Sequence, residues 1–220
     1  MFRLLSILFI ITLVCCRCAS SSVTTTWKDP NAARLLYNKI LVVAVIQDTN
    51  ISFRKSMEDH LVEDLKQLGY RSVSAMQEFG PNGLVNVEQE ATYVKLCGRG
   101  IDAVLTIALL DKKKESNSVK TSDRYSSSIE YYNRVWNYRN IAANLMDSSA
   151  NTIGNKRFFW ETMLFDLSTL SPVYLVKTRS FPPPFSDAIA HDYGRLIVGS
   201  MLRKKVVKAQ PVSSNTLQAF

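Results

Sequence analysis

The stretch at residues 39–46 reads Lys39-Ile40-Leu41-Val42-Val43-Ala44-Val45-Ile46. Its seven consecutive apolar residues are mostly β-branched, and polar residues flank the run on both sides. Such a run is typical of a strand that is buried on both faces, as a central strand of a parallel sheet is. The stretch therefore predicts an α/β fold.

The residues that follow predict the rest of a βαβαβ unit. Apolar residues three or four apart over residues 53–68 predict an amphipathic helix, and residues 70–74 predict a short strand. Residues 101–110 predict another buried strand. Between these two strands, the sequence predicts a second helix that begins at Asn86, ends at Gly98 or Gly100, and has an apolar stripe of Val87, Ala91 and Val94.

The C-terminal part predicts a different arrangement. Two β-rich runs joined by a polar turn with Pro172 predict an antiparallel β-hairpin over residues 157–181. Spaced apolar residues predict a final helix against the sheet, namely Phe185, Ile189, Tyr193, Leu196, Ile197 and Met201. The expected fold is thus a mixed sheet of about five strands flanked by helices, in one domain over residues 37–208, with a loose tail at 209–220.

The chain of 220 residues is 46% apolar and 21% charged, which fits a globular protein and excludes a wholly disordered one. Its net charge is +8, and residues 112–139 alone contribute 7 − 3 = +4. Residues 112–155 interrupt the strand and helix pattern for longer than an ordinary loop does, so we expect an extended arm or irregular excursion there.

Aromatic and arginine side chains alternate in this arm, as they do in recognition surfaces. Packing of the rings onto the protein's own sheet is the alternative, and the sequence favours it slightly. The apolar N-terminal run, with cysteines at its end, predicts an envelope location. If the surface exists, its partner is therefore another envelope protein or an anionic envelope component, and no nucleic-acid partner is expected. The candidate partner surface comprises Arg124, Tyr132, Arg134, Trp136, Tyr138 and Arg139.

The N-terminus predicts a lipoprotein signal peptide over residues 1–15. After the basic start at Arg3, the apolar run 4–14 has the length of a signal-peptide core and is too short to span a bilayer. Cysteine follows where a signal peptide usually carries small residues, as in a bacterial lipobox. The pattern favours Cys16 as the lipidated residue, with Cys18 as the alternative, and an ordinary signal peptide is the remaining interpretation.

Residues 16–36 are expected to form a flexible tether, because residues 19–26 are almost all small and hydroxylated. Two or three acyl chains on one cysteine give stable membrane anchoring. Since no Asp follows Cys16, the predicted location is the outer membrane, facing the periplasm. A secreted or soluble periplasmic protein is the alternative.

Four short motifs resemble a family of uncharacterised Gram-negative envelope lipoproteins of the Bacteroidetes type. In order, the motifs are Cys-Ala-Ser-Ser with Thr-Thr-Trp-Lys-Asp-Pro, Lys-Ile-Leu-Val-Val-Ala-Val, Leu-Gly-Tyr, and Trp-Glu-Thr-Met-Leu-Phe-Asp-Leu-Ser-Thr. The resemblance covers most of residues 16–205. It implies a small α/β domain and an envelope location, and it brings no catalytic residues.

Few residues are of the types and spacings that form catalytic or metal-binding sites, and we expect no metal site, cofactor or catalytic residue. His60 and the His191-Asp192 pair have no nearby partner with metal-ligand spacing in the sequence. Cys97 is expected to be a small buried residue, and the acidic pairs Glu58-Asp59 and Glu63-Asp64 are expected on the solvent side of the first helix.

These observations predict a non-enzymatic envelope lipoprotein that serves as a binding or assembly module. The alternative is a small-ligand-binding protein or enzyme that uses the carboxyl ends of the sheet strands, where open α/β sheets bind ligands. Residues 47–50, with the sequence Gln-Asp-Thr-Asn, would be its polar groups.

Overall fold

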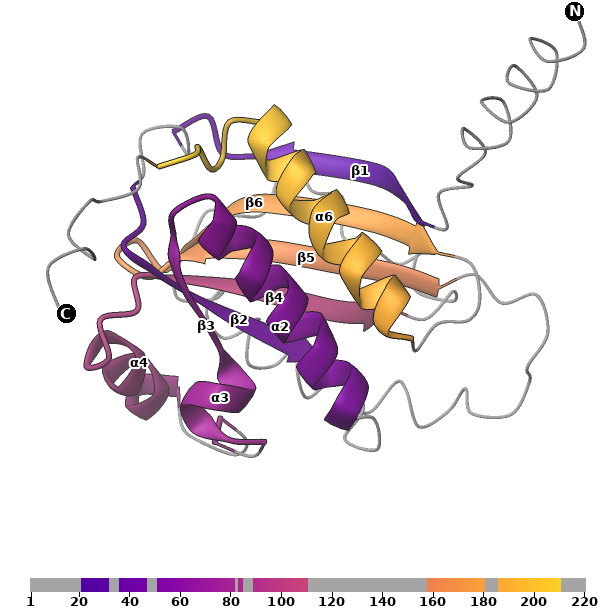
Figure 1. Ribbon diagram of the computed structural model, residues 1–220. Coiled ribbons are helices and arrows are strands. Elements are labelled where there is room, and N and C mark those ends of the chain that lie inside the picture. The colour runs from indigo at the N-terminus through magenta and orange to yellow at the C-terminus, as the bar shows by residue number, and fades with distance from the viewer. Residues whose placement is uncertain are drawn as a thin grey trace, which may run out of the picture.

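The computed structural model describes residues 21–31, 36–46, 51–81, 83–84, 89–110, 158–180 and 186–210. Within them, six strands form one mixed sheet in the order β1-β6-β5-β4-β2-β3 (Figure 1). The strands are β1 (Ser21–Lys28), β2 (Lys39–Val45), β3 (Arg71–Ser74), β4 (Ala103–Leu110), β5 (Phe158–Asp166) and β6 (Ser171–Ser180). The helices are α2 (Ile51–Gln67), α3 (Ala75–Phe79), α4 (Gln89–Cys97) and α6 (Asp187–Arg203).

The pairing of the strands confirms the predicted topology. β2 pairs in parallel with β3 on one side and with β4 on the other, so the run at residues 39–46 forms a central strand. β5 and β6 form the antiparallel hairpin, and β5 joins it to β4, also in antiparallel orientation. The α/β fold class and the C-terminal helix are as the sequence predicted.

The sheet separates two apolar cores, and β2 contributes to both. Ile40 and Val42 lie in the core beneath α2 and α6, which run side by side over one face (Figure 1). Leu41 and Val43 lie in the opposite core together with Ala75 of α3 and residues of α4. Because side chains alternate between the faces of a strand, burial on both faces requires an uninterrupted apolar run.

The first core is centred on Trp160, whose side chain is fully buried between α2 and α6. Its ring centroid lies 6.0 Å from that of Phe53 and 5.6 Å from that of Tyr193. Gly194 lets α6 approach α2 closely, because a Cβ atom there would lie 2.6 Å from Asp64 Oδ2 and 3.5 Å from the α2 backbone.

We therefore expect Gly194→Val to lower the free energy of unfolding by about 1–3 kcal/mol, because its methyl groups must push α6 off α2. Gly199→Val is the matched control, since a Cβ atom there meets only Arg203 Nη1 at 3.5 Å. That control should change the free energy of unfolding by less than about 0.5 kcal/mol, because Val and Gly differ little in helix propensity. Urea denaturation followed by circular dichroism measures both changes, and equal stability of the two variants would contradict close helix packing at Gly194.

The expectation of a flexible tether over residues 16–36 is wrong for β1. This strand pairs along its length with β6 and is the sixth strand of a sheet for which about five were expected. Val23 packs against one core and Trp27 against the other. The hydroxylated side chains between them suit an edge strand whose backbone is hydrogen-bonded on one side only.

The expected stripe of the second helix is also wrong for Ala91 and Val94, while Val87 lies outside the described residues. In α4, Val94 is 62% exposed and Ala91 is exposed, whereas Thr92 and Leu96 are buried. The helix is therefore rotated so that Leu96, a larger apolar side chain, faces the sheet. Cys97, expected to be buried, is exposed at the end of the same helix.

Candidate functional site

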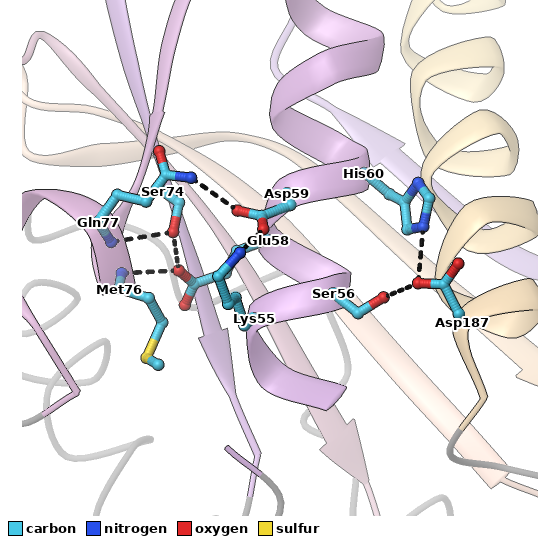
Figure 2. A network of polar contacts seen from close by, with 9 residues as sticks. All are labelled: Lys55, Ser56, Glu58, Asp59, His60, Ser74, Met76, Gln77 and Asp187. Atoms are coloured by element: carbon cyan, nitrogen blue, oxygen red, sulfur yellow. Dashed lines mark hydrogen bonds and ion pairs between the residues drawn. The ribbon is translucent and has the colours of Figure 1, made fainter. Parts of the chain in front are cut away.

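The polar side chains in the first half of α2 form two groups of contacts, shown in Figure 2. One group faces β3 and α3 and is centred on Glu58. The other faces the start of α6 and is centred on Asp187. Both lie toward the edge of the sheet where the parallel strands end, which is the usual ligand-binding edge of open α/β sheets.

Glu58 is fully buried and accepts three short hydrogen bonds. The Ala44 N–H donates to Oε1 at 2.9 Å. The Met76 N–H donates to Oε2 at 2.8 Å, and the Ser74 hydroxyl donates to the same oxygen at 2.6 Å. The carboxylate thereby connects α2 to β2, β3 and α3.

The strand register explains why a carboxylate is needed there. The pairing of β3 with β2 ends at Ser74 opposite Val42, and β2 continues past this point to Val45. Beyond Ser74 the chain turns into α3, with Ser74 as its N-cap. Glu58 thus accepts a hydrogen bond from the N–H of Ala44, which lies beyond the last residue of β2 that pairs with β3. It accepts another from the N–H of Met76, which lies in the first turn of α3 and has no acceptor within that helix.

Arg54 adds a positive charge beside this carboxylate. Its Nε lies 3.5 Å from Glu58 Oε1, and its Nη1 donates to the Pro81 carbonyl at 3.0 Å. Burial raises the pKa of Glu58 above its ordinary value, while the hydrogen bonds from Ser74, Ala44 and Met76 and the charge of Arg54 act in the opposite direction. The expectation that Glu58 lies on the solvent side of the helix is wrong.

The neighbouring acidic residue, Asp59, fits the expectation better. It is half-buried, forms an ion pair with Lys55 one turn earlier, and accepts a hydrogen bond from Gln77 Nε2 at 3.2 Å. An exposed i, i+4 ion pair of this kind contributes little to stability, because solvent screens the two charges. Asp59 therefore adds little to the network that Glu58 holds.

The second group contains a serine, an aspartate and a histidine. The Ser56 hydroxyl donates to Asp187 Oδ1, and His60 Nε2 lies 3.0 Å from the same oxygen. In a hydrolytic triad the histidine lies between the nucleophile and the carboxylate, whereas here the carboxylate lies between the other two. The hydrogen bonds from Ser56 and from His60 lower the pKa of Asp187. Because Ser56 and His60 lie on α2 and Asp187 lies on α6, these contacts form an exposed link between the two helices.

The two histidines of the chain, far apart in sequence, lie in contact. The ring centroids of His60 and His191 are 5.2 Å apart in an edge-to-face arrangement. Nearby, burial raises the pKa of Asp64, while the charges of His191, His60 and Arg195 oppose the rise. Among the described residues, however, no three His, Cys, Asp or Glu side chains are placed to hold a metal ion.

Several residues singled out from the sequence lie outside the described residues. They include the lipidation candidates Cys16 and Cys18 and the polar residues 47–50. The aromatic arm lies outside as well, with Arg124, Tyr132, Arg134, Trp136, Tyr138 and Arg139. The Glu58 network was missed, although Val62, one turn after Glu58 and also buried, signals that the buried face of α2 is wider than one stripe.

No helix in the described part of the chain has both the length and the apolar character needed to cross a membrane. No protein-family model matches the chain, and no curated protein does. Among solved structures, the chain is distantly similar to the PelC dodecamer from Paraburkholderia phytofirmans, with 12% identity and a TM-score of 0.43 over 87% of this chain and 99% of that one. A variant of the same PelC gives 11% identity and a TM-score of 0.41 over 86% and 98%.

Proposed function

We propose that the protein is a non-enzymatic lipoprotein of the bacterial envelope, a binding or assembly module held at a membrane by acyl chains on Cys16. The observation that carries the proposal is the N-terminal sequence, a short apolar run that ends in cysteines instead of the small residues of an ordinary signal peptide. Cys18 is the alternative site of lipidation.

The polar network supports a module over an enzyme. The acceptors of Glu58 are occupied by donors from the protein itself, and Asp187 joins two helices. A general acid or base instead has to reach a reacting group with its proton-transferring atom. We place the module in the outer membrane facing the periplasm, because Arg17 and not Asp follows Cys16.

The anchor can be tested by palmitate labelling in a Gram-negative host. Cys16→Ser should abolish the labelling and move the protein from the membrane fraction to the soluble fraction, because no acyl chain is then attached. Cys18→Ser is the matched control and should stay labelled and membrane-bound. The reverse pattern would assign the anchor to Cys18, and an unlabelled wild-type protein would contradict the proposal.

A further inference from the structure

Most of the positive side chains that the described residues expose lie at one end of the sheet. This end, which we call the Lys28 end, is where β1 stops and where β2, β3 and β4 begin (Figure 1). The helix α2 ends there because it leads into β3, and α6 ends there because Lys28 Nζ donates to the carbonyl of Lys204 at 3.1 Å. We call the exposed cations at this end the basic band, which comprises Lys66, Arg71, Arg203, Lys204, Lys205 and Lys208.

The chain after α6 carries the basic band across the end of the sheet. It leaves α6 beside the end of β1 and reaches the turn between α2 and β3. The Lys208 N–H donates to the Tyr70 hydroxyl at 3.1 Å, and the Gln210 N–H donates to the Leu68 carbonyl at 2.7 Å. These hydrogen bonds bring the cations that follow α6 toward those at the end of α2 and the start of β3.

Carboxylates do not neutralise the basic band. Among the described residues, none forms an ion pair with its side chains. Exposed Glu90 and Asp187 lie in the first turns of α4 and α6, away from the band. The acidic residues at the Lys28 end accept hydrogen bonds from backbone N–H groups of the protein itself, namely Asp29, Asp102 and Asp166.

Lys205 has a backbone conformation that usually requires glycine. Its φ is 55°, in the left-handed region. The Lys205 N–H donates to the Leu202 carbonyl and the Val206 N–H donates to the Met201 carbonyl, both at 2.9 Å, which is the Schellman pattern at a helix end. Glycine is the common residue at this position because a side chain there is strained. A lysine that keeps its charge in the band despite this strain points to a functional role.

Two exposed leucines accompany the basic band. Leu36, three residues before β2, is 82% exposed, and Leu202, in the last turn of α6, is 37% exposed. Cations and apolar side chains on one surface fit the interface of a bilayer, where the cations meet lipid phosphates and the apolar groups enter the headgroup layer. A wholly polar polyanion would contact the cations but leave the leucines in water.

We propose that the basic band binds an anionic phospholipid surface, with Leu36 and Leu202 in the headgroup layer. This contact needs no acyl chain, so it goes beyond the anchor proposed above. In the acylated protein, the segment from Cys16 to Ser21 reaches at most about 18 Å, whereas β1 rises about 24 Å from Ser21 to Lys28. The anchor and the basic band therefore meet the same bilayer when β1 is inclined to it.

Vesicle binding tests the proposal on residues 16–220, the mature chain that the signal peptide predicts, with Cys16→Ser and Cys18→Ser to prevent acylation. This chain contains every described residue and lacks the apolar run 4–14, which would bind vesicles by itself. Cosedimentation compares vesicles of phosphatidylcholine and phosphatidylglycerol with vesicles of phosphatidylcholine alone. The chain should bind the anionic vesicles, and added salt should weaken the binding. Absence of binding to the anionic vesicles would overturn the proposal.

Two pairs of substitutions locate the contact. Lys204→Gln with Lys205→Gly should raise the dissociation constant for anionic vesicles about 25-fold, because each cation near such a surface contributes about fivefold. Lys205→Gly alone should weaken binding about fivefold without lowering the melting temperature, since glycine suits the left-handed backbone. Lys55→Gln with Arg195→Gln removes the same net charge from exposed positions of α2 and α6 outside the band and should change binding less than about twofold. Equal losses for the two pairs would overturn the assignment to the basic band.

Leu202→Gln distinguishes a lipid surface from a polar polyanion. It should weaken binding to the anionic vesicles several-fold and leave retention on immobilised dextran sulfate unchanged. Unchanged vesicle binding of this variant would overturn the lipid assignment in favour of a polar anion. The anchor fails separately, because palmitate labelling of Cys16 does not depend on the band and the vesicle test uses a chain without acyl groups.

Discussion

Val43→Asp should abolish cooperative folding. Val43 is 6% exposed, lies in central strand β2 opposite Thr106 of β4, and packs in the core shared with α3 and α4. An aspartate there buries a carboxylate with no positive partner, which costs several kcal/mol. Because a domain of this size is stable by only about 5–15 kcal/mol, this cost removes much or all of the stability.

Val94→Asp makes the same chemical change at an exposed position of α4 and is the matched control. It should change the free energy of unfolding by less than about 0.5 kcal/mol, as surface substitutions usually do. Urea denaturation followed by circular dichroism compares the two variants with the wild type. A Val43→Asp protein that is soluble and unfolds cooperatively at the wild-type midpoint would show that β2 is not a central strand.

The elements that the sequence predicted well are those whose burial leaves a local pattern. Residues 39–46 are apolar throughout because both faces of β2 are covered, so the central position is visible without knowledge of the neighbours. The hairpin of β5 and β6 is joined by a short turn at residues 167–170, and its pairing is local. In both cases the sequence pattern that predicts the element, an apolar run or a short turn between two strands, lies within the element itself.

β1 left no such pattern. Its apolar contacts come only from Val23 and Trp27, and the remaining side chains resemble those of a flexible linker. What orders this segment is the backbone of β6, about 150 residues further along the chain. A strand whose stability comes from a distant partner is one in which tertiary contacts override local preference.

Val62 indicates that the buried face of α2 is wide, but the hydrogen-bond partners of Glu58 could not be predicted, for a similar reason. Glu58 is buried because β3 ends at Ser74 while β2 continues, and no property of the sequence around Glu58 records where β3 stops. His60 and His191 meet because α6 packs against α2. A polar residue on a helix is assigned to solvent by default, and only the packing of the elements reveals the exceptions.

Glu58→Leu should lower the free energy of unfolding by about 3–5 kcal/mol, the range found when one member of a buried ion pair is removed. The substitution leaves the N–H groups of Ala44 and Met76 and the hydroxyl of Ser74 without their acceptor. It also leaves the charge of Arg54 buried without its carboxylate. Each unsatisfied buried donor costs about 1–3 kcal/mol, so the lost hydrogen bonds matter at least as much as the lost charge pair.

Two further variants separate these causes. Arg54→Leu in the Glu58→Leu background removes the unpaired charge but restores no acceptor, so it should recover only a minor part of the lost stability. Asp59→Leu, the next residue along α2, loses only contacts with Lys55 and Gln77 and should cost less than about 1 kcal/mol. Full recovery in the double variant would show that the charge pair, and not the missing acceptor beside β3, is what Glu58 contributes. Losses of similar size for Glu58→Leu and Asp59→Leu would contradict the buried network as a whole, because Glu58 is fully buried whereas its neighbour Asp59 is only half-buried.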